Sequence, residues 1–452
     1  MRARGHLNRA LPLIQSSLAM RRHFFRSSHP LIAVCLNSIG DILRAENKFR
    51  EAYSVYDKSL EILNESFTGI TDNHSYILDV RHNIAILYYA EGRYNESELI
   101  YRSLLQKRID MMGVITHSLT HSLTHSLTHS LTHSPTHSLT QAMHPSVGQI
   151  LNNYASLLHV TEAHEQAADM YVRCLMVKRQ VFGACHPDVA LAMNNYGLLL
   201  KSQGKYEEAE KIYNEALEIQ RTTLTQDHPD IAATYNNLAV VFTLPLTHPL
   251  THPLTHSLTQ VFATQSRIAE AMKLFRKSID MKRKIYGYND IQVASALNNY
   301  AGLLYSIKEY GEAKELYHES MAIRKYVYGD NHPTVAESIN NIALLQFLQG
   351  QYHEAKALYE QCLAIKLAVY GSAHSAISSS YNNLAGTLHR LGKLEVALNL
   401  YNKALEIRKR VVDEKNMNGN TMTLEGDEEA ANIMANIAAV QSDISRCTTA
   451  RN

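Results

Sequence analysis

The chain lacks tryptophan and has few cysteines. It contains no Trp and five Cys, which lie scattered at Cys35, Cys174, Cys185, Cys362 and Cys447 without a CxxC pair. An odd number of dispersed cysteines provides neither a disulfide framework nor the ligand spacing of a zinc or redox site. This usage is typical of the cytosol, so we expect a cytoplasmic protein.

Charge of one sign and long apolar runs are missing as well. The 44 basic and 43 acidic side chains leave a net charge of +1, which gives no electrostatic basis for binding nucleic acid or an anionic membrane surface. No apolar run reaches the roughly 18 residues of a membrane helix, and no secretory signal follows the start. We therefore expect a soluble chain, no nucleic-acid partner and no membrane insertion.

Catalytic motifs are also absent. The sequence has no GxxxxGK phosphate loop, no GxSxG, no HExxH and no Gly-rich dinucleotide turn. Carboxylates such as Glu207, Glu208 and Glu312 recur at a fixed spacing, which indicates solvated helix faces. We predict a protein that is not an enzyme and has no cofactor or metal.

What the chain does contain is an internal repeat. The segment "HPDVALAMNNYGLLLKSQGKYEEAEKIYNEALEI" from His186 recurs as "HPTVAESINNIALLQFLQGQYHEAKALYEQCLAI" from His332. We take the first Asn of each Asn-Asn pair as a marker and count positions from it as +n, leaving residues 243–262 out of the count. The markers form two series with steps of 42 residues, and two earlier copies precede them: Asn152, Asn194, Asn236; Asn298, Asn340, Asn382; and, earlier, Asn37 and His82. The chain therefore holds eight units.

Each unit is predicted to be a helical hairpin. Its apolar residues fall at helical spacing in two blocks, which are separated by a turn such as Gln203 to Tyr206. Position +15 is always small: Ala52, Ser97, Ala167, Ala209, Ala271, Ala313, Ala355 and Ala397. Position +19 is always aromatic: Tyr56, Tyr101, Tyr171, Tyr213, Phe275, Tyr317, Tyr359 and Tyr401. Small residues let two helices approach closely, and the aromatics fill the gap between hairpins. A lone hairpin cannot bury its apolar stripe, so we predict an all-α fold, an α-solenoid of about eight stacked hairpins.

The recurring motifs "HPxVA", "NNLA", "QGKYxEA" and "LYxxALxI" resemble the tetratricopeptide repeat. More narrowly, they are similar to the 42-residue form found in kinesin light chains and nephrocystin-like proteins. The family's usual Trp in the first helix is replaced here by residues such as Met193, Leu297 and Ile339. The resemblance implies a solenoid that binds other proteins.

Several polar or reactive residues have a structural interpretation. Five prolines suit the first turn of a helix, where no amide donor is needed: Pro30, Pro145, Pro187, Pro229 and Pro333. The histidine before each is then predicted to cap that helix rather than to act in catalysis. Cys174 and Cys362 occupy a position that holds Ala216 and Ala404 in other units, so we expect them in the core.

Both ends of the chain follow the repeat pattern. Ile14, Leu18 and Met20 repeat the spacing of a second helix, and Arg21-Arg22 stand where Lys178-Arg179 do. Six arginines and no acidic residue before Asp41 would also suit a mitochondrial transit peptide, but we prefer the repeat interpretation. At the other end, "EEAANIMANIAAVQSDI" from Glu428 is predicted to be a lone first helix that caps the stack.

Two low-complexity tracts interrupt the period. The tracts at 116–143 and 243–262 are 28 and 20 residues long, which equals the excess over 42 at each place. The unit Thr-His-Ser-Leu can be encoded by ACT-CAC-TCA-CTC, so a translated four-base DNA repeat accounts for both.

The alternative is that the tracts bind metal, because histidines recur every four residues from His117 to His133. Thr, Ser and Pro135, however, disfavour the helix that would align these histidines. We expect the first tract to loop out between units. We expect the second to cut a first helix short after Phe242, because Pro245, Pro249 and Pro253 prevent its continuation, and to soften the joint there.

The expected organisation is therefore as follows: 1–28 a second helix only; 29–115 repeats 1 and 2; 116–143 an insertion; 144–242 repeats 3 and 4 with the first helix of repeat 5; 243–262 an insertion; 263–412 the rest of repeat 5 and repeats 6 to 8; 413–427 a polar loop; 428–446 a capping helix.

The marker asparagines are the candidate site. First helices line the concave side of such a stack, and an amide can pair with the backbone of an extended peptide. In kinesin light chains, Asn at these positions resembles a cargo-contacting ladder. The candidate peptide-binding residues are Asn37, Asn152, Asn194, Asn236, Asn298, Asn340 and Asn382, with the apolar neighbours Leu198, Tyr305, Leu344 and Phe347. The second Asn of each pair is expected to tie helices together.

Two functions remain open on the sequence. One is a non-catalytic scaffold that binds a peptide segment of a protein partner in the concave groove. The other is a kinesin-light-chain-like cargo adaptor, associated with the cytoskeleton, whose partners would be a kinesin heavy chain or its cargo. A light chain is expected to carry a coiled coil before its repeats, whereas this sequence begins inside a hairpin.

Overall fold

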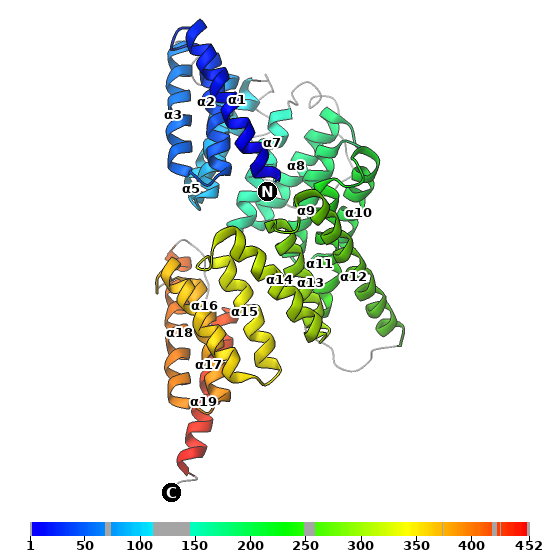
Figure 1. The fold of residues 1–452 in the computed structure, drawn as a ribbon, viewed down its shortest axis with the longest axis vertical. Coiled ribbons are helices and arrows are strands. Elements are labelled where there is room, and N and C mark those ends of the chain that lie inside the picture. The colour runs from blue at the N-terminus through cyan, green and yellow to red at the C-terminus, as the bar shows by residue number, and fades with distance from the viewer. Residues whose placement is uncertain are drawn as a thin grey trace. The chain divides into compact units, whose positions relative to one another are not determined.

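In the computed structural model, antiparallel helices follow one another through the described part of the chain (Figure 1). The structure describes residues 2–67, 74–111, 145–247, 258–372, 374–417, 423–424 and 426–449, and every regular element in them is a helix. The helices are α1 (Arg2–Phe24), α2 (Pro30–Ala45), α3 (Phe49–Ser66), α4 (Ser75–Ala90), α5 (Tyr94–Met111), α7 (Pro145–Val160), α8 (His164–Phe182), α9 (Pro187–Ser202), α10 (Tyr206–Thr223), α11 (Pro229–Thr247), α12 (Leu258–Tyr286), α13 (Ile291–Ser306), α14 (Tyr310–Tyr328), α15 (Pro333–Leu348), α16 (Tyr352–Tyr370), α17 (Ser375–Arg390), α18 (Leu394–Met417) and α19 (Glu428–Thr449).

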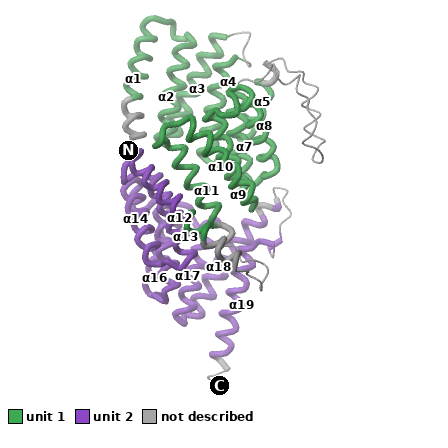
Figure 2. The backbone as a smooth tube through the Cα atoms, turned by 90° about the vertical axis from the view of Figure 1, so that its right-hand side faces the viewer, with its two compact units in different colours: residues 1–248, 266–271 green, residues 249–265, 272–452 purple. Residues whose placement is uncertain are grey.

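The helices form two compact units (Figure 2). Unit 1 comprises Met1–His248 and Ser266–Ala271, and unit 2 comprises Pro249–Gln265 and Met272–Asn452. Both units contain first helices that pack against their own second helix, as in α9 with α10 and α15 with α16. They also contain second helices that pack against the next first helix, as in α8 with α9 and α16 with α17. The predicted all-α solenoid of stacked hairpins is confirmed.

The hairpin turn depends on one residue in the left-handed region. Gly204 has φ +75° and follows α9, and the N–H of Lys205 donates to the carbonyl of Leu200 at 2.9 Å, which closes the helix end. The same position, +10, has positive φ in seven repeats: Asn47, Gly92, Glu162, Gly204, Lys308, Gly350 and Gly392. Position +10 thus separates the first from the second helix of these hairpins.

The fifth hairpin departs from this rule and corrects an expectation. α11 continues through Pro245 to Thr247, although we expected it to stop after Phe242. Pro245 lies two residues from the end of α11, so it removes only one terminal hydrogen bond. Position +10 is Ser266, which is helical because α12 already begins at Leu258. The first tract, 116–143, and residues 248–257 of the second lie outside the described residues.

The core follows the predicted positions. All eight residues at +15 are completely buried. The +19 rings are buried as well and touch both neighbours: a Cβ placed on Gly197 would lie 2.6 Å from the ring of Tyr213 in the same hairpin, and Tyr171 contacts Tyr196 of the next hairpin with centroids 5.9 Å apart. Tight helix pairs and filled gaps between hairpins are therefore both observed.

The predicted core cysteines are buried and reduced. Cys174 Sγ donates to the carbonyl of Gly148 at 3.1 Å, which ties α8 to α7. Burial raises the pKa of the Cys174 thiol to about 11, so it stays protonated at neutral pH. Cys362 is equally buried, and neither has the low pKa of a nucleophile.

Histidines cap the first helices, as predicted. In six repeats the Nδ1 of a histidine accepts the backbone N–H two residues on, at 3.1–3.2 Å: His29, His74, His186, His228, His332 and His374. Asp290 does the same for α13, while His144 lies outside the described residues. Most of these rings stack on an aromatic at the end of the preceding helix, as Tyr328 does on His332.

The two terminal helices are placed by the same contacts as the inner ones. Leu18 of α1 is buried, and Arg21 donates to the carbonyl of Leu31 at 2.8 Å, as Lys178 does to Asp188. At the other end α19 buries Ile433 and Val440. α18 extends to Met417, into the expected polar loop, because residues 413–417 contain neither Gly nor Pro.

Candidate functional site

The first helices form one side of each unit, which we call the inner face. Consecutive first helices contact one another, namely α2 with α4, α4 with α7, α7 with α9, α9 with α11 and α17 with α19. Consecutive second helices make no comparable contact among the helices that the structure describes. A stack that is closer on one side curves toward that side, so the inner face of unit 1, to which four of these five contacts belong, is concave.

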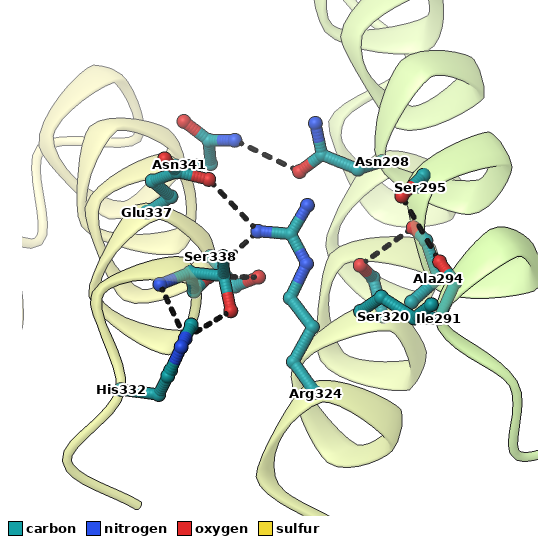
Figure 3. Close-up of polar contacts among 11 residues, drawn as sticks. Ile291, Ala294, Ser295, Asn298, Ser320, Arg324, His332, Glu337, Ser338 and Asn341 are labelled. Atoms are coloured by element: carbon teal, nitrogen blue, oxygen red, sulfur yellow. Dashed lines mark hydrogen bonds and ion pairs between the residues drawn. The ribbon is translucent and has the colours of Figure 1, made fainter. Parts of the chain in front are cut away.

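The Asn-Asn pairs interlock neighbouring first helices on this face. Asn341 of α15 donates through Nδ2 to Oδ1 of Asn298 on α13 at 3.1 Å (Figure 3). The same bond recurs from the second Asn of one repeat to the marker of the repeat before it: Asn83 to Asn37, Asn195 to Asn152, Asn237 to Asn194, Asn383 to Asn340, and Asn436 to Asn382. The second Asn therefore ties helices together as predicted, and its acceptor is the preceding marker.

The markers retain a donor after this bond is made. Asn298, Asn340 and Asn382 are half-buried, and within the described residues their Nδ2 groups donate to no acceptor. Unit 1 differs, because Nδ2 of Asn152 is taken by Asn153 at 3.2 Å and Asn194 is buried. Unit 2 therefore presents a row of three available amide donors.

Apolar and aromatic side chains run beside this row. Positions +4 and +7 of unit 2 hold Gly302, Leu344 and Gly386, then Tyr305, Phe347 and His389, all half-buried. The rings at +7 meet a ring at the start of the second helix, Tyr305 with Tyr310 at 6.2 Å and Phe347 with Tyr352 at 5.4 Å between centroids. The sequence prediction missed Tyr310 and Tyr352, although a tyrosine ends the turn in four of the eight units and was a usable signal.

In unit 1 the candidate residues Asn37, Asn152, Asn194, Asn236 and Leu198 lie on the corresponding first helices α2, α7, α9 and α11. His82 takes the marker place in α4, and its Nε2 lies 2.9 Å from Nδ2 of Asn153. Burial, with Arg108 and Arg44 nearby, lowers the pKa of His82 to about 4. His82 is therefore neutral and accepts the bond that an Asn oxygen accepts elsewhere.

A buried cation at +26 is a second repeated tie that sequence reasoning missed. Arg324 of α14 reaches between α13 and α15, where it donates to the carbonyl of Thr334 at 2.6 Å and to Glu337 at 3.2 Å (Figure 3). Basic residues recur at this position: Arg108, Lys178, Lys282, Arg324, Lys366 and Arg408. Burial lowers the pKa of Lys282 to about 8. Lys178, Arg324 and Lys366 each donate to a carbonyl of the next first helix, whereas Arg108 donates to Ser75 of its own hairpin. These contacts belong to the scaffold.

No cluster of three or more His, Cys, Asp or Glu side chains with metal-binding geometry occurs in the part of the chain that the structure describes. The histidine tract of 116–143 lies outside that part. Likewise, none of the described helices is long and apolar enough to cross a membrane.

Comparison with known proteins identifies the repeat. One tetratricopeptide repeat model matches residues 146–222, 189–244, 292–368 and 335–410, and a second matches residues 77–117. A comparison with curated proteins gave no match.

Solved structures resemble the chain at the level of the fold. The apo form of the quorum sensor NprR from B. thuringiensis has 14% identity and a TM-score of 0.54, and covers 90% of this chain and 98% of its own. A putative kinesin light chain of Podosopora anserina with nearly identical TPR-like repeats has 21% identity and a TM-score of 0.40, with 50% and 97% covered. BtubC (BKLC) from P. vanneervenii has 18% identity and a TM-score of 0.42, with 58% and 92% covered.

The family matches fall on the hairpins that the 42-residue period delimits, and the helices, caps and turns agree with them. The chain therefore belongs to the tetratricopeptide repeat family.

Proposed function

We propose that the chain is a non-catalytic scaffold that binds an extended peptide segment of a protein partner along the inner face. The observation that carries this proposal is the row of Asn298, Asn340 and Asn382, whose Nδ2 donors are left over after the interlock is made. The coarser conclusion, an interaction scaffold, follows from the repeat family.

A row of amides is suited to a peptide main chain. Each Nδ2 group can donate to a backbone carbonyl whatever the peptide side chain is, and one such bond contributes a net 0.5 to 1.5 kcal/mol or so. Tyr305, Leu344 and Phe347 add apolar area beside the donors. Three bonds and this area are consistent with micromolar affinity once ordering costs are included. In unit 1, Asn37, Asn152, Asn194, Asn236 and Leu198 are the corresponding candidates.

The test uses Asn→Asp rather than Asn→Ala. Aspartate keeps the Oδ1 that accepts the interlock bond, removes the donor and adds a negative charge. Asn298→Asp, Asn340→Asp and Asn382→Asp together therefore address binding with the interlock acceptors retained. A linear peptide is first selected from a random phage-displayed library on the full chain. We expect at least a ten-fold loss of its affinity in the triple variant, measured by fluorescence anisotropy.

Asn341→Asp is the matched control, because it changes the same chemistry at the structural partner of Asn298. It should lower the melting temperature, since the donor of the interlock is lost, whereas the marker variant should melt close to wild type. Unchanged affinity in the triple variant, with melting temperatures as stated, would show that the markers do not bind the peptide.

A second candidate is the kinesin-light-chain-like adaptor, with a kinesin heavy chain or its cargo as partner and a cytoskeletal rather than a general cytoplasmic location. It is favoured by the 42-residue period that this chain shares with those proteins. Co-purification of a kinesin heavy chain with the full chain, and its loss in the triple variant, would support the adaptor. Purification without a motor subunit would leave only the general scaffold.

A further inference from the structure

Two of the tyrosine hydroxyls at +19 contact a side chain on the first helix of their own hairpin. Tyr56 Oη donates to Asp41 Oδ1 at 2.7 Å, and Tyr171 Oη lies 2.9 Å from Ser156 Oγ. Asp41 and Ser156 both stand at +4, on the inner face. In repeats 1 and 3, therefore, the +4 side chain provides the partner that a buried hydroxyl requires.

Repeats 6 and 8 have no such partner. Position +4 is Gly302 or Gly386, and the tyrosines below, Tyr317 and Tyr401, are 6% and 2% exposed. Among the described residues neither hydroxyl has a hydrogen-bond partner, and neither hydroxyl oxygen is shielded from solvent, unlike the unpartnered hydroxyl of Tyr213. A Cβ on Gly302 would lie 3.8 Å from Tyr317 Oη, and one on Gly386 would lie 3.3 Å from Tyr401 Oη. Each hydroxyl is thus aimed at the space that the missing side chain leaves on the inner face.

We call the spaces beside Gly302 and Gly386 the glycine notches. We propose that the main chain of the bound peptide contacts the protein at these two notches, where one peptide carbonyl oxygen accepts from Tyr317 Oη and another from Tyr401 Oη. The inference rests on the proposed function, because it places the same extended peptide on the same face. Glycine is the residue that allows another backbone to approach this closely.

The chemistry favours an acceptor over a donor in the notch. Burial raises the pKa of Tyr317 to about 12, and burial raises the pKa of Tyr401 as well. Both hydroxyls therefore keep their proton at neutral pH and can donate it to a carbonyl oxygen. The neighbouring markers, Asn298 and Asn382, also offer donors, so each notch presents two donors to one stretch of peptide.

The spacing of the notches sets a register. Repeat 7 lies between them and carries Leu344 at +4, so a side chain rather than a carbonyl faces it. With about 10 Å between consecutive first helices and about 3.3 Å per extended residue, the two bound carbonyls would lie roughly six residues apart.

The test measures the selected linear peptide on full-length variants. Tyr317→Phe removes only the hydroxyl, and Gly302→Ala fills the notch with a methyl group at an ordinary contact distance. We expect each to weaken binding about three- to ten-fold, which corresponds to one lost hydrogen bond. Because both remove the same bond, the double variant should bind no more weakly than the weaker single variant.

Two controls separate this effect from changes in the scaffold. Gly311→Ala is a second Gly→Ala change in a helix, at a position where a Cβ meets nothing within 4 Å, and Tyr359→Phe removes the hydroxyl of repeat 7. Neither should change affinity.

The outcomes also separate the two proposals. Wild-type affinity in Tyr317→Phe and Gly302→Ala, with loss in Asn340→Asp, would overturn the notch contacts and leave the peptide-binding face standing. Wild-type affinity in all three would overturn both, and so would failure of the library to yield any binding peptide.

Discussion

The residues that lie against the +19 rings are expected to tolerate a larger side chain least. Gly197 lies against Tyr213, which is fully buried between α9 and α10, and an added Cβ would come within 2.6 Å of the ring. Gly302 lies one position further along its own helix, and a Cβ added there would be 3.8 Å from the nearest atom, Tyr317 Oη. A methyl group would therefore clash with the Tyr213 ring at Gly197, whereas at Gly302 it would make an ordinary contact.

Gly197→Ala is expected to lower the free energy of unfolding by about 1 to 3 kcal/mol, because the ring must move and overpacking costs that much. Gly302→Ala should instead raise it by up to about 1 kcal/mol through helix propensity. Urea unfolding followed by circular dichroism measures both. Equal effects of the same sign would mean that the ring contact does not limit the site.

His82 is expected to make folding sensitive to mild acid. Its folded pKa of about 4 lies below the ordinary value of 6.5, so the unfolded chain takes up the proton first as the pH falls. The stabilisation is complete above pH 6.5 and is lost progressively toward pH 4, with about 2 kcal/mol gone by pH 5. His82→Asn, which restores the usual marker, should show a smaller loss between pH 7 and pH 5. Parallel unfolding curves of wild type and variant over this range would contradict the assignment.

At the scale of elements, most first helices are defined by a cap at their start and a left-handed residue after their end. His332 accepts the N–H of Thr334 at 3.2 Å, and Asp290 performs the same role for α13 at 2.8 Å. The chain itself therefore shows which residues are interchangeable at the cap.

His332→Ala is expected to cost about 1 kcal/mol of stability, because one helix-terminal N–H loses its acceptor. His332→Asp should restore most of this, as the carboxylate both caps the helix and interacts favourably with its dipole. Thermal unfolding of the two variants measures the difference. A result in which Asp is no better than Ala would indicate that stacking with Tyr328 matters more than the cap.

Most elements could be predicted because their signals repeat at a fixed spacing. The small residue at +15 and the aromatic at +19 recur in every unit, so register errors would have been visible. The fifth hairpin could not be predicted in detail: its turn position is Ser266 rather than a residue that favours positive φ, so α12 runs through it. The acceptor of each second Asn and the cation ties such as Arg324 also escaped prediction, because they join residues of different repeats and only a structure shows which atoms meet.

At the scale of the whole molecule, the interlocking asparagines and buried cations repeat along the helices of each unit. One of these contacts joins residues on either side of the first inserted tract, because Asn153 of α7 reaches His82 of α4. The packing on either side of the tract is that of consecutive repeats.

Deletion of 116–143 should therefore leave the fold intact and raise the free energy of unfolding by roughly 1.5 kcal/mol or less, the closure entropy of the longer loop. Circular dichroism and urea unfolding check this. A large loss of helix on deletion would show that the tract has a structural role.

The central claim is that the inner face of the first helices is the peptide-binding surface. The most direct measurement is photo-crosslinking of the selected peptide to the full chain with benzoylphenylalanine placed at Leu344, on the inner face, or at Tyr326, an exposed position on the second helix α14. We predict an efficient crosslink from position 344 and none from position 326. A crosslink from position 326 alone would contradict the account and move the binding surface to the second helices.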